Sequence, residues 1–191
     1  MDNPTRVLTT LDRHLNHEVS LVIYGRAALC LGFDQPREEF ANTEDVDGII
    51  RLSQSDALSN DAGFWDAIEA TNEELETDGL YLTHLFRADQ VFLRADWERH
   101  IQPIARPTTK HLNLLRPATI DLILTKMMRG ADDLDMEDIT FLVHSEPVTL
   151  AAIERAFEQV RLPDVPELQQ AFEKAKPLVR QIVSRFSGIE D

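Results

Sequence analysis

Two aspartates, Asp45 and Asp47, stand one residue apart in the segment TEDVDGII, residues 43–50. Side chains two positions apart along an extended strand point to the same side, so we expect the two carboxylates to converge. Carboxylate oxygens are the ligands that a hard cation such as Mg²⁺ prefers in proteins. The pattern therefore predicts a metal-binding catalytic pair or, in a chain with 34 acidic residues, simply the acidic start of a strand.

A glycine turn lies about 20 residues before this pair. Residues 19–24, VSLVIY, form a β-branched apolar run that is typical of a buried strand, and the run ends at Gly25. The small residues 26–32 that follow favour a short helix. A strand that turns at a glycine into a helix presents backbone N–H groups that can bind phosphate. The alternative is a tight turn without a ligand.

The surrounding pattern places these residues in a mixed sheet. We expect a helix over residues 4–16, a strand at 45–52 and a long acidic helix over 55–78. Two further strands, 80–86 and 90–95, are expected to be joined by a polar turn. Strands that alternate with helices predict an α/β (α+β) fold.

The second half of the chain shows helical patterns from Pro117 onward. Apolar residues recur at helical spacing over 120–128, 136–143 and 150–160, with Thr149 as the expected N-cap of the third helix. A last helix is expected from Asp164, with a kink at Pro177. We therefore expect two domains: a sheet unit over residues 1–105, and a helical unit over 106–191 packed against it.

The order of these elements resembles the nucleotidyltransferase superfamily of the polymerase-beta type. The segment VIYGRAALCLG, residues 22–32, followed by TEDVDGII is similar to the minimal bacterial branch that includes the AbiEii-type toxins. Residues 116–143 resemble the family segment in which a lysine-bearing helix precedes a helix with D-x-x-D. Here these residues are Lys126, Asp135 and Asp138. The resemblance spans residues 21–143 and implies a nucleotidyltransferase-like mixed sheet.

The activity that the resemblance implies is transfer of a nucleotidyl group from a nucleoside triphosphate to an RNA or protein acceptor, with release of pyrophosphate. Asp45 and Asp47 would hold the metal, Mg²⁺ or Mn²⁺. The residues that the resemblance assigns to the nucleotide are Gly25, Arg26, Thr43, Lys126 and Asp138. A pairing with an antitoxin protein is left open.

Two departures from the family pattern are the reason for a second, alternative function. Arg26 stands where the superfamily usually has glycine or serine, and His84 stands where relatives tend to have the third metal-binding aspartate. A neutral imidazole is a poor Mg²⁺ ligand but can act as a base, so His84 is a catalytic candidate as well as an ordinary strand histidine. Asp89 is a weaker replacement for the missing carboxylate. The alternative function is a degenerate member that binds a nucleotide or a protein partner without chemistry.

The overall composition limits which binding partners we expect. The formal net charge of −15 opposes non-specific DNA binding, since that binding depends on neutralising phosphates with Lys and Arg. The charge is concentrated in residues 1–105, with 8 basic and 20 acidic side chains against 11 and 14 in residues 106–191. No apolar run approaches the roughly 20 residues that a bilayer requires, so we expect a cytoplasmic protein without a membrane partner. The single cysteine, Cys30, is expected to pack in the core.

Overall fold

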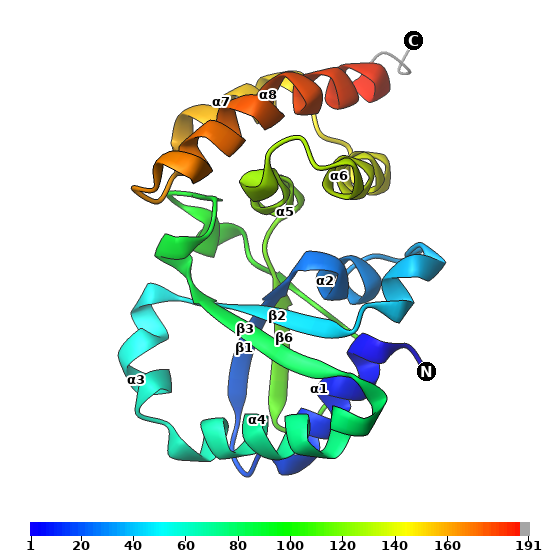
Figure 1. Cartoon of the computed structure of the whole chain (residues 1–191), viewed down its shortest axis with the longest axis vertical. Coiled ribbons are helices and arrows are strands. Elements are labelled where there is room, and N and C mark those ends of the chain that lie inside the picture. The colour runs from blue at the N-terminus through cyan, green and yellow to red at the C-terminus, as the bar shows by residue number, and fades with distance from the viewer. Residues whose placement is uncertain (188–191) are drawn as a thin grey trace. The chain divides into compact units, whose positions relative to one another are not determined.

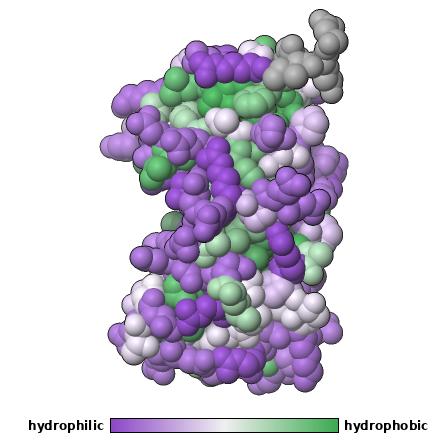
Figure 2. Space-filling model, turned by 90° about the vertical axis from the view of Figure 1, so that its right-hand side faces the viewer, coloured by the Kyte–Doolittle hydropathy of each residue, from purple (hydrophilic) through white to green (hydrophobic). Residues whose placement is uncertain are grey.

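The computed structural model describes residues 1–187 and divides into two compact units. The first unit contains Met1–Arg87 and Ile101–Arg116, and the second contains Ala88–His100 and the chain from Pro117 onward. The face drawn in Figure 2 is mostly hydrophilic, in keeping with the high net charge. None of the helices within the described residues is long and apolar enough to cross a membrane.

The first unit is a mixed five-stranded sheet with helices, which confirms the α+β fold class (Figure 1). The strand order is β3-β2-β1-β6-β5. The pairs β2–β3 and β1–β6 are parallel, whereas β1–β2 and β5–β6 are antiparallel. The elements of this unit are α1 (Asn3–His14), β1 (Val19–Tyr24), α2 (Gly25–Leu31), β2 (Asp45–Ile50), α3 (Ser55–Ser59), α4 (Ala62–Leu75), β3 (Tyr81–Arg87), β5 (Gln102–Pro103) and β6 (Leu112–Arg116).

The second unit consists mainly of helices, with one short antiparallel pair of strands. Its elements are β4 (Leu93–Arg94), α5 (Thr119–Lys126), α6 (Asp133–Ser145), α7 (Leu150–Gln159), β7 (Val160–Arg161) and α8 (Pro166–Ser187). Thr149 caps α7 as predicted, because its hydroxyl accepts a hydrogen bond from the N–H of Ala152 at 3.2 Å. Helix α8 begins at Pro166, two residues after the predicted start, and continues through Pro177.

Helix α1 shows how the apolar pattern fixes packing in the first unit. The Asp2 carboxylate caps the helix by accepting a hydrogen bond from the N–H of Thr5 at 2.8 Å. Val7, Leu8 and Leu11 recur at helical spacing and are fully buried. This stripe covers the sheet, and α1 also packs along α4 (Figure 1).

Three expectations about local structure were wrong. The long helix expected over 55–78 is two helices, because Asp61 starts α4 anew by accepting a hydrogen bond from the N–H of Phe64 at 3.0 Å. The strand expected at 90–95 shrinks to β4, which pairs with β7 and forms no hairpin with β3. The buried Asp121 carboxylate holds β4 in the second unit through the backbone N–H and guanidinium of Arg94. The third difference is strand β6, where no strand was expected.

The boundary between the two units is not a single position in the sequence, because each unit contains two separate segments of the chain. Strand β6 follows residue 105 in the sequence yet is a central strand of the first unit's sheet, whereas Ala88–His100 groups with the helices. The reason is that β6 completes the sheet by pairing with β1, Val19 opposite Leu112. The expected packing of the helical domain against the sheet domain stays a prediction.

The loop before β6 is held by one carboxylate of α1. Asp12 accepts hydrogen bonds from the backbone N–H groups of Lys110, His111 and Leu112, at 2.7 to 3.1 Å. Burial opposes the ionisation of Asp12, but these hydrogen bonds outweigh burial and lower its pKa below the ordinary value. Asp12 therefore fixes where β6 starts.

We predict that Asp12→Asn lowers the free energy of unfolding by about 1–3 kcal/mol, because charge-assisted hydrogen bonds are replaced by weaker ones. Since the folded-state pKa is lowered, the contribution of Asp12 is present above the carboxyl's ordinary pKa and is lost as the pH falls through the folded value. Urea unfolding at pH 7 measures the loss, with the exposed Asp66→Asn as the matched control. A loss no larger than that of the control would contradict the prediction.

Candidate functional site

The two aspartates of the opening motif lie on β2, where Asp45 is the first residue of the strand. Asp45 is exposed, and the side chain of Asp47 is 25% exposed. Burial raises the pKa of Asp47, and the charge of Asp45 raises it further, against the lowering effect of hydrogen bonds from Thr83 and His84. The pair therefore forms one negatively charged site, as the spacing along the strand predicts.

A β-bulge in β3 brings two side chains to Asp47. Val46 pairs with Leu82 and Gly48 pairs with Leu85, so two residues of β3, Thr83 and His84, lie opposite the single residue Asp47. The Thr83 hydroxyl donates to Asp47 Oδ1 at 3.2 Å, and His84 Nδ1 lies 3.2 Å from the same oxygen. Because a carboxylate only accepts hydrogen bonds, His84 serves as a donor at Nδ1.

The His84 ring has a defined surface position. Its side chain is 60% exposed, and the imidazole stacks on Phe86 with ring centroids 5.4 Å apart and an interplanar angle of 9°. Phe86 in turn meets the ring of Tyr24 edge to face at 6.4 Å. Tyr24 is the partner of Asp47 on β1, and burial, followed by the charges of Asp47 and Asp45, raises the pKa of its phenol. An aromatic group therefore borders the carboxylates.

Gly25 connects β1 to α2 beside Asp47. Its φ of +64° lies in the left-handed region of backbone conformation, which residues other than glycine rarely adopt. A Cβ added there would lie 3.7 Å from Asp47 Oδ2, which is ordinary van der Waals contact. The backbone conformation, rather than lack of space, thus requires a glycine at this turn.

Two other residues assigned to the nucleotide also lie in the first unit. The Thr43 hydroxyl donates to Asp45 Oδ1 at 3.2 Å and so orients the exposed carboxylate. The guanidinium carbon of Arg26 lies 5.7 Å from the ring centre of Phe40, a cation–π contact. Part of the environment of Arg26 is therefore an aromatic face on the 3₁₀ helix Glu38–Asn42.

Lys126 and Asp138 belong to the second unit, where they form an ion-pair cluster. Lys126 Nζ lies 2.7 Å from Asp138 Oδ2 and 3.2 Å from Asp135 Oδ1. The side chains of Lys126 and Asp138 are 12% and 1% exposed. Asp135 also accepts a hydrogen bond from Arg129 Nε at 2.7 Å. These contacts tie α5 to α6.

The metal ligands available from the protein are few. Within residues 1–187, no group of three or more His, Cys, Asp or Glu side chains is placed to hold a metal ion. Asp89 lies in the 3₁₀ turn Ala88–Gln90 of the second unit, whereas Asp47 lies in the first.

No sequence pattern identifies Thr83, Tyr24 and Phe86 as neighbours of the carboxylates. Alternation along YLTHLF, residues 81–86, predicts that Thr83 and His84 point to opposite sides of the sheet. The bulge breaks this alternation and brings both to Asp47. The bulge depends on pairing with β2, which no local sequence pattern encodes.

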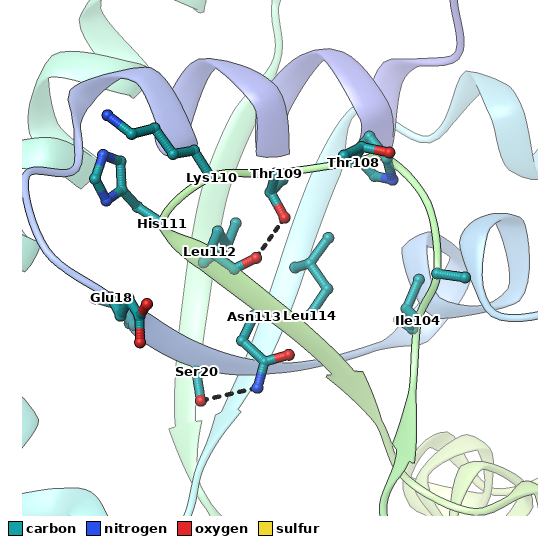
Figure 3. A pocket seen from close by; sticks show the side chains of 13 residues that line it. Glu18, Ser20, Ile104, Thr108, Thr109, Lys110, His111, Leu112, Asn113 and Leu114 are labelled. Atoms are coloured by element: carbon teal, nitrogen blue, oxygen red, sulfur yellow. Dashed lines mark hydrogen bonds between the residues drawn. The ribbon is translucent and has the colours of Figure 1, made fainter.

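A cavity of about 560 Å³ opens at the start of β1 and β6, the end of β1 away from Tyr24 (Figure 3). It lies between these strands and the loop before β6, and no sequence pattern points to it. Asn113 donates to the Ser20 hydroxyl at 3.2 Å across its floor. None of the residues assigned to nucleotidyl transfer lines this cavity.

Comparisons with protein-family models, with curated proteins and with solved structures find no match for this chain.

We predict that Asp45→Asn lowers the pKa of Asp47, because the substitution removes a negative charge that opposes its ionisation. Carboxyl ¹³C chemical shifts, followed through a pH titration of protein labelled at aspartate, measure the change. Glu44→Gln removes an exposed charge one residue earlier and should leave the Asp47 titration nearly unchanged. An Asp47 titration that is the same in Asp45→Asn and wild type would show that the carboxylates do not interact.

We predict that Lys126→Ala lowers the free energy of unfolding by about 3–5 kcal/mol, because it removes the ammonium group that compensates two buried carboxylates. Arg129→Ala removes a cation whose side chain is 60% exposed and should have a smaller effect, about 1 kcal/mol or less. Urea unfolding followed by circular dichroism compares the two variants. Equal losses would contradict a structural role specific to Lys126.

Proposed function

We propose that this chain is a nucleotidyltransferase-like protein that transfers a nucleotidyl group from a nucleoside triphosphate to a hydroxyl of an RNA or protein acceptor. The observation that carries the proposal is the Asp45–Asp47 pair on β2, beside the positive-φ turn at Gly25. A close pair of carboxylates, one of which has a raised pKa, is a site that gains from a bound cation.

In this reaction, different residues of the first unit would have different roles. Asp45 and Asp47 would hold Mg²⁺ or Mn²⁺, which supplies charge neutralisation of the triphosphate and of the developing negative charge. The acceptor oxygen forms a bond to the α-phosphorus, and the bond from that phosphorus to the bridging oxygen breaks, so that pyrophosphate leaves. His84, exposed beside Asp47, is the candidate base for the proton of the acceptor hydroxyl.

A second candidate function is binding of a nucleotide or protein partner without chemistry. Two observations favour it: His84, beside Asp47, stands where the resemblance leads us to expect a third carboxylate, and Arg26 follows the glycine turn. A site with two carboxylates and a histidine can still bind a metal–triphosphate complex. The two functions differ in whether phosphorus changes its bonding partner.

We predict that the purified protein transfers label from one of the four nucleoside triphosphates, labelled at the α-phosphate, to total RNA or to a cell extract with Mg²⁺ or Mn²⁺. Asp45→Asn and Asp47→Asn should each reduce transfer by roughly 100-fold or more, because each removes a ligand of the metal that stabilises the transition state. The measurement is labelled acceptor recovered on gels, with Glu44→Gln as the charge-matched control, expected to keep wild-type transfer.

Binding of the same triphosphates, measured by calorimetry with the metal present, separates the two functions. Binding without transfer, weakened in Asp47→Asn, supports the second candidate. Absence of transfer with either metal, together with unchanged triphosphate binding in both aspartate variants, would refute the proposal that these residues form the site.

A further inference from the structure

A second feature of the first unit, separate from the carboxylate pair, is an open pocket of about 470 Å³ along α4. Its wall consists of two aromatic side chains, Trp65 and Tyr81, with Ile68 between polar groups of the helix. The lining residues of α4 recur at helical spacing from residue 65 to residue 73, so they form one stripe on the helix surface. Tyr81 extends the pocket onto the start of β3.

The aromatic wall is held in place before any ligand binds. Trp65 is 38% exposed, and its indole N–H donates to the carbonyl of Leu58 at 2.8 Å. The ring also packs edge to face against the buried Phe64, with centroids 5.2 Å apart. Because the polar edge of the indole is already bonded to backbone, what Trp65 offers to a ligand is a π face.

Three carboxylates, Glu69, Glu73 and Glu76, surround this face. All three are exposed, and within residues 1–187 none of them forms an ion pair with a basic side chain. The neighbouring Glu74, in contrast, binds Arg13 and His14. The three pocket glutamates therefore present negative charge to the solvent.

The sequence on both sides of these glutamates is also acidic. Between Arg51 and Arg87 the chain has eight Asp or Glu residues and no Lys or Arg. Along the helix the three glutamates span about 10 Å, at a rise of about 1.5 Å per residue. This spacing suits separate cationic groups on one segment.

We propose that this pocket binds a basic peptide segment of a partner protein, with an arginine or lysine side chain over the face of Trp65 and a second basic side chain on the glutamates. The complementarity is twofold: a cation on an aromatic face is attracted by the ring quadrupole, and the carboxylates supply charge-assisted hydrogen bonds. None of the pocket residues takes part in the proposed nucleotidyl transfer, so the inference is independent of that function.

The test uses the full chain and a fluorescein-labelled 12-residue peptide with arginine at positions 4 and 8 in a neutral Gly/Ser/Gln background. Fluorescence polarisation at about 0.15 M salt measures binding, since surface attraction alone is largely screened there. The paired variant Glu69→Gln/Glu73→Gln should weaken binding at least tenfold. The matched control, Glu158→Gln/Glu167→Gln, removes two exposed charges from the second unit and should change binding less than twofold.

The aromatic part of the site is tested separately. Trp65→Leu should weaken peptide binding about five- to tenfold, while Trp65→Phe, which keeps a ring and its packing, should lose less. Circular dichroism verifies that both variants are folded. A peptide in which both arginines are replaced by glutamine should not bind.

Four results would overturn the proposal. They are absence of binding up to 1 mM peptide, equal weakening in the two glutamate pairs, full binding in Trp65→Leu, and self-association that Glu69→Gln/Glu73→Gln abolishes in sedimentation velocity. The second result would mean non-specific charge attraction, and the last would mean that another copy of this chain occupies the pocket.

Discussion

The partly buried charge of Asp47, beside the charge of Asp45, is the constraint on which the rest of the first unit's candidate site depends. Burial disfavours the ionised state of Asp47 most, and the negative charge of Asp45 disfavours it further. Hydrogen-bond donors offset this cost. Because of the bulge, Thr83 and His84 both donate to one oxygen of Asp47, and Thr43 donates to Asp45. Carboxyl groups with shifted pKa values cluster at functional sites in proteins, which makes this pair a candidate site.

The second unit handles buried charge in a different way. There Asp135 and Asp138 lie against Lys126, and Asp121 lies against Arg94, so each buried carboxylate is compensated by a cation from the same unit. Compensation of this kind fixes the packing of helices but leaves little charge for a ligand. By this criterion the pair on β2, which within residues 1–187 forms no ion pair with Lys or Arg, is the better candidate for binding a cation.

The sequence was sufficient for features that depend on local patterns. The β-branched run of β1, the Gly25 turn and the Thr149 cap were each predicted, because residue type alone determines them. It was insufficient where pairing partners decide the structure. Strand β6 is short and half polar, and only its place between β1 and β5 makes it a strand.

The same limit applies to the site itself. The sequence pattern selects Asp45, Asp47 and His84 as candidates but does not select Thr83, because the bulge that places Thr83 and His84 together opposite Asp47 depends on strand pairing. Lys126, which the resemblance assigns to the nucleotide, has its ammonium group held by two carboxylates. Contacts between distant segments, rather than residue types, determine both outcomes.

The number of carboxylates also determines how a metal and a nucleotide would bind. Mg²⁺ takes six oxygen ligands and commonly keeps several waters, binding through one or two carboxylates and the phosphates of its substrate. With Asp45 and Asp47 as its protein carboxylates, the cation would depend on the triphosphate for affinity, and the triphosphate would depend on the cation because the pair alone repels it. Under the proposed function, metal and nucleotide binding at β2 would therefore be mutually dependent.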